Sequence, residues 1–199
     1  MVLELKSVKY RILTINTCVK TKEFRELNPS LKVPVLLHGT NLFSLTSIDD
    51  SELAIEYIDT LIPQPSLKPI IKRRLGVGND GSSVYSRFAA LMKNKDPAKD
   101  NKLKERLLSE LKQLDIFLQS RKTESGAESY YLDGKGVSLA DCSLLPKLWE
   151  LKVAGVKKNF EIPSSLQAVT EYLAMAQKNT AFARSKPSDR DIIEHWSNN

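Results

Sequence analysis

The sequence Tyr131-Leu-Asp-Gly-Lys-Gly-Val-Ser-Leu-Ala-Asp-Cys-Ser-Leu-Leu-Pro-Lys-Leu-Trp149 decides the fold of this 199-residue chain, because it predicts the start of a buried central helix. Gly134 and Gly136 allow the dihedral angles of a tight turn. Ser138 is a good N-cap, and Asp141 is the third helical residue, where its carboxylate can reach back to the backbone N–H of the cap. The pair therefore predicts a capping box.

Apolar residues follow this box at helical spacing. Val137 precedes the cap and can pack on the first turn, while Leu139, Cys142, Leu145 and Trp149 recur about one turn apart. Many buried helices begin with Ser-x-x-Asp, so the box alone is compatible with a purely structural role. The longer pattern predicts that the helix lies in the centre of the fold.

The longer pattern also resembles known sequences. Gly134-x-x-Val137-Ser138-x-x-Asp141 is similar to the folding motif that opens the core helix of the glutathione-transferase C-terminal domain. The stretch from Leu139 to Leu148 resembles the same helix in the chloride intracellular channel family. Plant dehydroascorbate reductases, which share that fold, carry a similar Asp…Leu-x-Pro-Lys-Leu pattern.

The composition indicates an ordinary globular chain, with 41% hydrophobic and 27% charged residues. Such a chain can bury a good core as one or two packed domains. Cys18 and Cys142 fit neither a disulfide framework nor a metal-ligand spacing, and two scattered histidines are too few for a metal site. Charged residues near the start of the chain interrupt the apolar run that a secretory signal peptide needs. The longest uncharged run, residues 33–48, is not expected to span a membrane, because it contains Pro34 and Gly39. We therefore expect a cytoplasmic protein without a metal.

The net charge of +6 is concentrated in the middle of the chain. Residues 65–106 hold 11 Lys and Arg against 4 Asp and Glu, whereas residues 1–64 hold 7 against 8 and residues 107–199 hold 12 against 12. Two basic clusters lie at the ends of the middle segment. The first consists of Lys68, Lys72, Arg73 and Arg74, and the second consists of Lys93, Lys95, Lys99, Lys102, Lys104 and Arg106. These residues are either a patch for anionic lipid headgroups or a solvated linker with helix ends. Nucleic acid is not an expected partner, because no aromatic platform accompanies the charge.

The beginning of the chain mixes helix and strand patterns. Residues 2–8 have the pattern of the tail of a helix, and residues 9–15 alternate like a half-buried strand. A short helix through Phe24 and Leu27 is expected to stop at residues 28–29, because Asn28 precedes a proline.

The next segment predicts a hairpin followed by a helix. Residues 35–37 and 42–45 are expected to pair across residues 38–41. The following helix, residues 49–58, begins with acids and a hydroxyl, so its N-terminus could receive a small zwitterion or simply be capped. Its expected inner face consists of Leu53, Ile55, Tyr57 and Ile58.

The Val33-Pro34 pair has two interpretations. It is either an edge-strand or loop proline, or a cis peptide that leaves the Val33 backbone free to pair with a peptide ligand. Residues 28–36 resemble the Asn-Pro-x-x-Lys-Val-Pro-x-Leu segment of the thioredoxin-like half of glutathione transferases, in which that proline is cis. The resemblance implies a glutathione site made by Val33 and Pro34 with Asp50 and Ser51, the latter two holding the γ-glutamyl end.

After Pro65 every segment has a helical pattern. We expect helices over residues 82–94 and 99–119, a polar loop over residues 120–129, the central helix, and two further helices after residues 164 and 189. The expected inner residues of these helices, apart from the central one, are Val84, Phe88, Leu91, Leu103, Leu107, Leu111, Leu114, Leu118, Leu166, Val169, Leu173, Met175, Ile192, Ile193 and Trp196.

Along essentially its whole length the sequence resembles the chloride intracellular channel family. The resemblance implies an α/β thioredoxin-like N-terminal half, truncated and covering residues 1–64, and an all-α glutathione-transferase C-terminal domain over residues 65–199. It further implies a soluble form that can associate with membranes and conduct chloride, and weak glutathione-dependent thiol chemistry. Glutathione, anionic membrane surfaces and cytoskeletal or other proteins are the implied partners.

The sequence departs from this family at its start. Members begin with a strand, followed by a Cys-Pro-Phe-Ser or related motif, and only then carry a segment similar to residues 1–15. The given sequence contains neither the strand nor the motif. Cys18 follows the expected strand 9–15 and does not lie at the start of a helix, where the helix dipole would lower its pKa. Cys142 lies in the apolar stripe of a helix, which indicates a buried structural residue. No catalytic residue is therefore assigned. We expect the missing strand to leave residues 10–15 without a neighbour, and an intact relative to carry upstream residues.

Three functions remain open from the sequence. The first is a chloride-channel-family protein that moves between soluble and membrane forms. The second is a glutathione-dependent oxidoreductase similar to dehydroascorbate reductases or omega transferases. The third is a non-catalytic module that binds glutathione, partners or anionic membranes.

Overall fold

The structure is a computed structural model in which two units are distinguished. Val2–Leu67 form a unit of helices and strands, called the mixed unit here, and Lys68–Asn199 with Met1 form the helical unit. The residues that the structure describes are 1–15, 21–39, 45–68, 82–125, 131–134 and 136–197.

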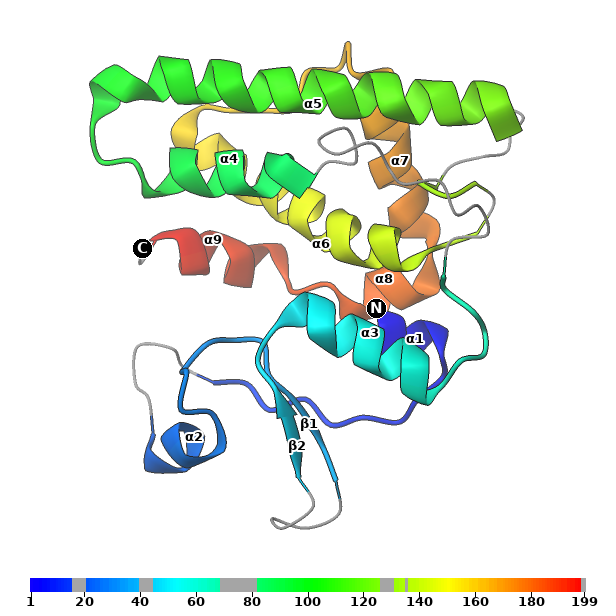
Figure 1. The fold of residues 1–199 in the computed structure, drawn as a ribbon. Coiled ribbons are helices and arrows are strands. Elements are labelled where there is room, and N and C mark those ends of the chain that lie inside the picture. Colours follow the sequence, from blue (N-terminus) through cyan, green and yellow to red (C-terminus); the bar gives the residue numbers. More distant parts are fainter. Residues whose placement is uncertain (16–20, 40–44, 69–81, 126–130, 135, 198–199) are drawn as a thin grey trace. The chain divides into compact units, whose positions relative to one another are not determined.

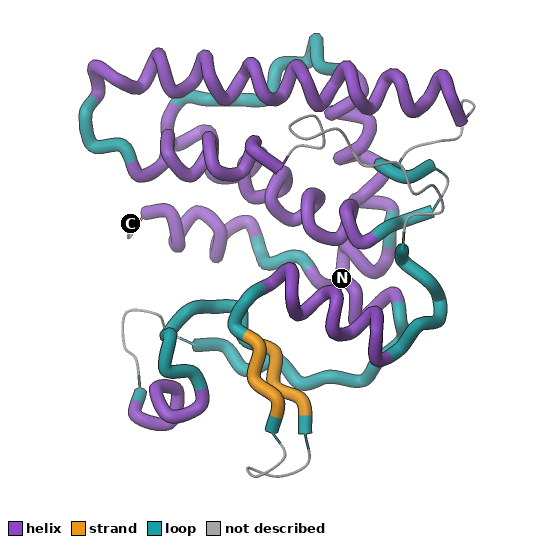
Figure 2. Tube along the Cα trace, in the orientation of Figure 1, coloured by secondary structure: helices purple, strands orange, loops and turns teal. Residues whose placement is uncertain are grey.

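The mixed unit has a small antiparallel sheet followed by a helix (Figures 1 and 2). Leu36 of β1 lies opposite Ile48 of β2, and His38 lies opposite Thr46. Helix α3 packs against β2 and α1. The described elements are α1 (Val2–Leu5), α2 (Lys22–Leu27), β1 (Leu36–His38), β2 (Thr46–Ile48) and α3 (Ser51–Leu61).

A buried lysine of the mixed unit connects the end of α1 to α3 and to the residues after α3. The Lys6 ammonium, just after α1, lies 2.7 Å from a carboxylate oxygen of Asp59 on α3, and both side chains are almost inaccessible. The same ammonium donates to the backbone oxygens of Ile62 at 2.6 Å and Pro65 at 2.9 Å. A buried ammonium is tolerated only when it is paired and hydrogen-bonded, and these acceptors meet that need.

The helical unit is built around one central helix. Figure 1 shows α6 in the middle of this unit, and it packs against α4, α7 and α9. The core is formed by apolar residues of these helices and of α5, including Phe88, Leu111, Leu145 and Tyr172. The elements are α4 (Ser82–Lys93), α5 (Pro97–Ser125), α6 (Leu139–Ala154), η2 (Gly155–Lys158), α7 (Gln167–Lys178), α8 (Thr180–Ser185) and α9 (Asp189–Ser197).

Helix α6 begins with a capping box. The Ser138 hydroxyl accepts from the backbone N–H of Asp141, and the Asp141 carboxylate accepts from the backbone N–H of Ser138 at 2.8 Å. This carboxylate also accepts from the Leu132 N–H at 2.9 Å and from the Tyr172 hydroxyl at 2.7 Å. Burial raises the pKa of Asp141, while its hydrogen bonds act in the opposite direction. One side chain thus joins the turn before α6, the start of α6 and α7.

Helix α7 is capped by a different helix. Its N-cap residue, Leu166, has no side chain that can accept a hydrogen bond. Instead the buried Asp115 of α5 accepts from the backbone N–H of Val169 at 3.0 Å. The other Asp115 oxygen accepts from Gln119 at 2.7 Å. A carboxylate at a helix N-terminus also interacts favourably with the helix dipole.

Several sequence predictions are wrong in detail. Residues 9–15 belong to no strand, because no described neighbour pairs with them. Thr46–Ile48, just beyond the predicted strand, pair with β1, and the predicted strand 42–45 lies largely outside the described residues. Leu53 is 59% exposed instead of facing inward, because it lies on the side of α3 away from Ile58.

Two corrections concern the helical unit. Helix α5 continues to Ser125, so the first part of the expected 120–129 loop is helical. Arg121 explains the extension in part, because its buried guanidinium donates to the backbone oxygen of Leu132 at 3.0 Å. Ile193 on α9 is 40% exposed, whereas Ile192 and Trp196 are buried as expected.

Candidate functional site

The four residues predicted to bind glutathione lie at one end of the hairpin. The pairing of Leu36 with Ile48 places the residues before β1 beside those after β2, because the strands are antiparallel. Val33 and Pro34 precede β1, and the peptide bond between them is cis. Asp50 and Ser51 follow β2 and open α3.

Val33 presents its backbone at this end. Its residue surface is 49% exposed, and its N–H and C=O make no hydrogen bond to another described residue. An exposed backbone amide with both groups unused can pair with an extended peptide as a neighbouring strand does.

Asp50 has a structural role that the sequence left open. One of its carboxylate oxygens accepts from the backbone N–H groups of Glu52 at 2.9 Å and Leu53 at 3.0 Å. This is an ordinary N-cap arrangement, and Ser51 is the first residue of the helix. The end of the hairpin therefore carries a negative charge and a hydroxyl side by side.

A positive charge that the sequence did not indicate, that of Lys32, lies near the acids that precede α3. A hydrogen bond from the Ser30 hydroxyl holds the pKa of Asp49 below its usual range, and the positive charge of Lys32 acts in the same direction. Lys32 directly precedes Val33, but its closeness to Asp49 follows from the β1–β2 register, which sequence spacing alone does not give. The site thus offers groups of both signs, as a zwitterionic ligand requires.

The thiols give no reactive centre within the described residues. Cys142 is buried on α6 with 4% of its surface exposed, and a reactive thiolate needs access to its substrate. Cys18 lies outside the described residues. Among the described residues, no group of three or more His, Cys, Asp or Glu side chains could hold a metal ion.

The basic middle segment is only partly described. Lys68 is exposed, and Lys72, Arg73 and Arg74 lie outside the described residues. Around the α4–α5 turn, some of the charge is paired locally, since Lys99 lies 3.1 Å from Asp96 and Lys158 lies 3.5 Å from Asp100. Other cations there are exposed: Lys93, Lys95, Lys102 and Arg106.

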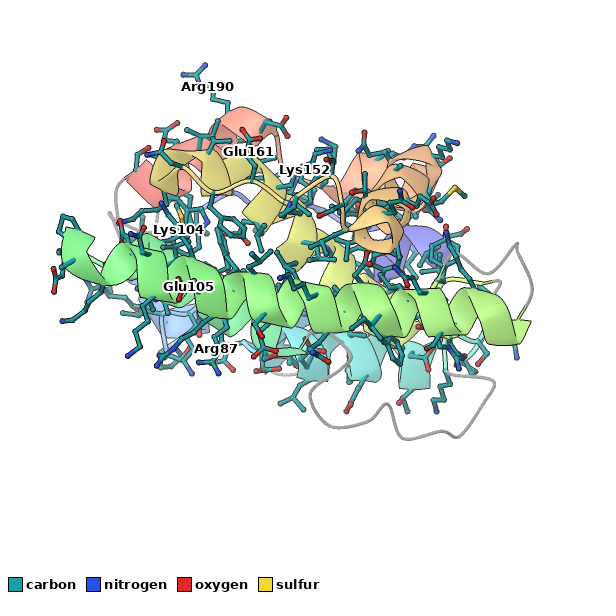
Figure 3. The ribbon with its side chains drawn as sticks, turned by 90° about the horizontal axis from the view of Figure 1, so that it is seen from above. Arg87, Lys104, Glu105, Lys152, Glu161 and Arg190 are labelled. Atoms are coloured by element: carbon teal, nitrogen blue, oxygen red, sulfur yellow. The ribbon has the colours of Figure 1, made fainter. Side chains whose placement is uncertain are left out.

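A shallow hollow lies beside α5, where Figure 3 shows Lys104 and Glu105 on the helix and Glu161 on the segment next to it. Its volume is about 380 Å³, and it is lined by charges of both signs. Lys104 of the second basic cluster lines it, whereas the residues predicted to bind glutathione do not. Across the described part of the chain, no helix combines the length and the apolar character needed to cross a bilayer.

The fold is that of a glutathione-transferase-like protein, and comparisons with known proteins agree. Residues 1–61 match the glutathione S-transferase N-terminal domain family. A dehydroascorbate reductase of Chlamydomonas reinhardtii has a similar structure, with a TM-score of 0.82 and 23% identity over 99% of this chain and 86% of that chain. A tau class glutathione S-transferase from mango gives a TM-score of 0.78 at 15% identity, over 98% of this chain and 89% of that chain. The predicted fold class is therefore confirmed.

The chain belongs to the chloride intracellular channel family. Human chloride intracellular channel protein 3 is 31% identical over an alignment of 204 residues, which covers 97% of this chain and 84% of the human protein. The mouse protein of the same name is also 31% identical over 97% of this chain and 83% of its own length. The chloride intracellular channel homologue EXC-4 from C. elegans shares the fold with a TM-score of 0.71 at 20% identity, over 99% of this chain and 74% of that chain. The family suggested by the sequence is thus confirmed.

Proposed function

We propose that this chain associates with membranes and contributes to chloride transport. The observation that carries the proposal is its 31% identity, over nearly the whole chain, to proteins named chloride intracellular channel protein 3. The concentration of positive charge in residues 65–106 supports it, because each basic side chain near an anionic leaflet contributes roughly 1 kcal/mol to binding.

In this proposal the first basic cluster, which consists of Lys68, Lys72, Arg73 and Arg74, binds the anionic membrane surface. Replacing all four by Gln is expected to abolish sedimentation with vesicles that contain phosphatidylserine. The matched control replaces Lys93, Lys95, Lys99 and Lys102 by Gln, which removes the same charge from the end of α4, the turn after it and the start of α5. Binding to neutral phosphatidylcholine vesicles, or binding that is insensitive to salt, would contradict this assignment.

Chloride transport is tested separately with the same vesicles. The protein is added to phosphatidylserine-containing liposomes loaded with chloride, and efflux is followed with a chloride electrode after the membrane potential is collapsed. We expect efflux above that of protein-free liposomes, and little of it from the variant with four Gln substitutions. Efflux equal to the protein-free rate, in samples where the protein sediments with the vesicles, would refute the transport function.

A second proposed function is glutathione binding at the hairpin end. Asp50 and Ser51 bind the γ-glutamyl end, and the backbone of Val33, which bonds to no other described residue, pairs with the peptide part. The support is the convergence of these residues with Lys32 and Asp49 at one end of the sheet.

Asp50→Asn tests this site without removing the helix cap, because Asn and Asp cap helices about equally well. Calorimetric titration with reduced glutathione is expected to show at least about tenfold weaker binding, since an interaction with the ligand's ammonium is lost. Glu56→Gln removes one charge from the exposed side of the same helix and should leave binding unchanged. The dipeptide Cys-Gly lacks the γ-glutamyl end, so its weaker binding should not respond to Asp50→Asn.

Glutathione-dependent thiol oxidoreduction remains the alternative function. The similarity in fold to a dehydroascorbate reductase favours it, whereas the burial of Cys142 does not. The test is dehydroascorbate reduction by the chain and by the Cys18→Ala, Cys142→Ala double variant. Activity that disappears in the double variant supports a thiol mechanism, and activity that survives rules it out.

A further inference from the structure

One end of the helical unit carries an excess of positive charge. Figure 1 shows the end of α4 and the start of α5 together at this end, where residues 94–96 join them. Residues 93–106 hold six Lys and Arg against three Asp and Glu. The exposed cations of this stretch are called the α4–α5 basic surface here: Lys93, Lys95, Lys99, Lys102 and Arg106.

Two of the three acids in this stretch are engaged within the turn itself. Asp96 lies 3.1 Å from the Lys99 ammonium, and Asp100 lies 3.5 Å from the Lys158 ammonium. A hydrogen bond from Asn94 lowers the pKa of Asp100, and the charge of Lys158 acts in the same direction. The other cations of the α4–α5 basic surface form no ion pair with a described residue: Lys93, Lys95, Lys102 and Arg106.

Three cations of this surface share one face of α5, although this arrangement destabilises the helix. Lys99, Lys102 and Arg106 are spaced by three and four residues, so their side chains are neighbours. Like charges at these spacings repel each other, and Lys99 also lies in the first turn, where the helix dipole disfavours a cation. Natural sequences break such local rules mainly at functional sites. The face therefore indicates a role in binding rather than in folding.

The pattern of charge favours an acidic protein segment over a membrane or a nucleic acid. Asp96 and Glu105 are exposed between the cations, so they would repel a partner with continuous negative charge. A peptide can place its carboxylates opposite the cations alone. Residues 93–106 include no large exposed apolar side chain, which an amphipathic membrane-binding segment needs, and no aromatic ring on which a base could stack.

We propose that the α4–α5 basic surface binds an acidic segment of a partner protein. Lys99 and Arg106 lie about 10 Å apart along the axis of α5, at about 1.5 Å per residue. Lys93 and Lys95 extend the surface onto α4 and the turn. Ion pairs between exposed groups are individually weak and are screened by salt, so binding requires several carboxylates and weakens as the salt concentration rises.

Fluorescence anisotropy of a labelled decaglutamate peptide measures this binding at about 50 mM and about 300 mM salt. Wild type should bind the peptide at the lower concentration and release it at the higher one. Replacing Lys93, Lys95, Lys99 and Lys102 by Gln should raise the dissociation constant by about tenfold or more. The matched control replaces the first basic cluster by Gln and should change it less than about twofold. In vesicle sedimentation the two variants should exchange roles.

Lys102→Glu separates binding from folding. It places a carboxylate four residues before Arg106, which is a favourable pair on a helix, so the melting temperature should stay the same or rise. Affinity for decaglutamate should nevertheless fall by about fivefold or more, because a carboxylate replaces an ammonium within the surface. Lys112→Glu makes the same change of charge at another exposed position of α5 and should have a smaller effect.

Several outcomes would overturn the proposal. These are a wild type that does not bind decaglutamate at low salt, equal effects of the two Gln variants, and equal effects of Lys102→Glu and Lys112→Glu. Tighter binding of a single-stranded oligothymidine of equal charge, lost in the variant of the α4–α5 basic surface, would assign the surface to nucleic acid instead. Loss of vesicle sedimentation in that variant would assign it to membranes.

Discussion

The indole N–H of Trp196 on α9 donates a hydrogen bond of 2.6 Å to the carboxylate of Glu150 on α6. A second indole bond runs in the opposite direction, from Trp149 on α6 to Asp189 on α9 at 3.2 Å. Trp196 also packs edge-to-face on Phe88 of α4, with ring centroids 5.1 Å apart. The last helix is thus joined to the central helix by two reciprocal bonds.

Replacing Glu150 should loosen this contact. Glu150→Ala leaves the Trp196 indole and the Tyr85 hydroxyl without the acceptor that they share, and the expected loss is about 2 kcal/mol of the free energy of unfolding. Glu150→Gln keeps an acceptor oxygen and should cost about half as much. Urea unfolding followed by far-UV circular dichroism measures both, with Glu194→Ala on the exposed side of α9 as the control. Equal losses from Glu150→Ala and Glu194→Ala would contradict the role of this bond.

Tyr85 should make the free energy of unfolding decrease at alkaline pH. Burial, then the charge of Glu150 and a hydrogen bond to it, raises the pKa of Tyr85 to about 12 from the usual 10.0. Between these two values the unfolded chain loses the phenolic proton while the folded chain keeps it, so stability falls as pH rises. Tyr85→Phe should remove that part of the decline. The check is the difference in unfolding free energy between wild type and variant, which should change from pH 10 to 12 and stay constant from pH 7 to 9.

Replacing Asp141 should reduce the free energy of unfolding more than replacing Ser138, its partner in the capping box. Asp141→Asn replaces one acceptor oxygen by an NH₂ group that cannot accept from the Ser138 N–H, and a buried donor is left unpaired. We expect a loss of about 3 kcal/mol or more. Ser138→Ala removes a hydroxyl that accepts from the Asp141 N–H and donates to the Asp141 carboxylate at 2.6 Å, and should cost about 1–2 kcal/mol. Thermal and urea unfolding would contradict this if Ser138→Ala were the more damaging change.

Asp115 offers a pair of substitutions with different outcomes. Asp115→Asn keeps an oxygen for the Val169 N–H and should cost less than about 1 kcal/mol, the size of a charge interaction with a helix dipole. Asp115→Leu fills a similar space without an acceptor and should cost about 2–3 kcal/mol, because the N–H stays buried and unpaired. Hydrogen exchange of the Val169 amide, measured by NMR, should speed up in the Leu variant alone.

The Lys6–Asp59 pair predicts a rescue by double substitution. Lys6→Met leaves a buried carboxylate without its cation and should destabilise the mixed unit by about 3–5 kcal/mol. Adding Asp59→Leu removes the unpaired charge and should recover part of that loss. Limited proteolysis is a suitable readout, with cleavage within residues 2–67 fastest in the single variant. A double variant cleaved faster than Lys6→Met would show that the pair is not the cause.

Local patterns in the sequence predicted what is local in the structure. The Ser138–Asp141 box could be predicted because its members lie three residues apart, one turn of a helix. The Asp115–Val169 bond could not, because 54 residues separate its partners and Asp115 fits the polar pattern of any helix. The same holds for Lys6, whose acceptors are provided by residues 59–65.

The hairpin shows why the candidate site was only partly predictable. Thr46, Ser47 and Ile48 lie beyond the predicted strand and have weak strand character as a group, yet they pair with β1. Propensity measures how well a side chain fits a half-buried surface, and packing decides which residues meet that surface. Val33 and Asp50 were found by resemblance to a motif, whereas the nearness of Lys32 to Asp49 follows from the observed register.

The two tryptophans of the chain both lie at the contact between α6 and α9. Their intrinsic fluorescence is therefore a selective probe of the helical unit, and residues 2–67 contribute no indole emission. A melting curve read from fluorescence alone would follow only the helical unit. Comparing that curve with one from circular dichroism would reveal whether the two units unfold together or one after the other.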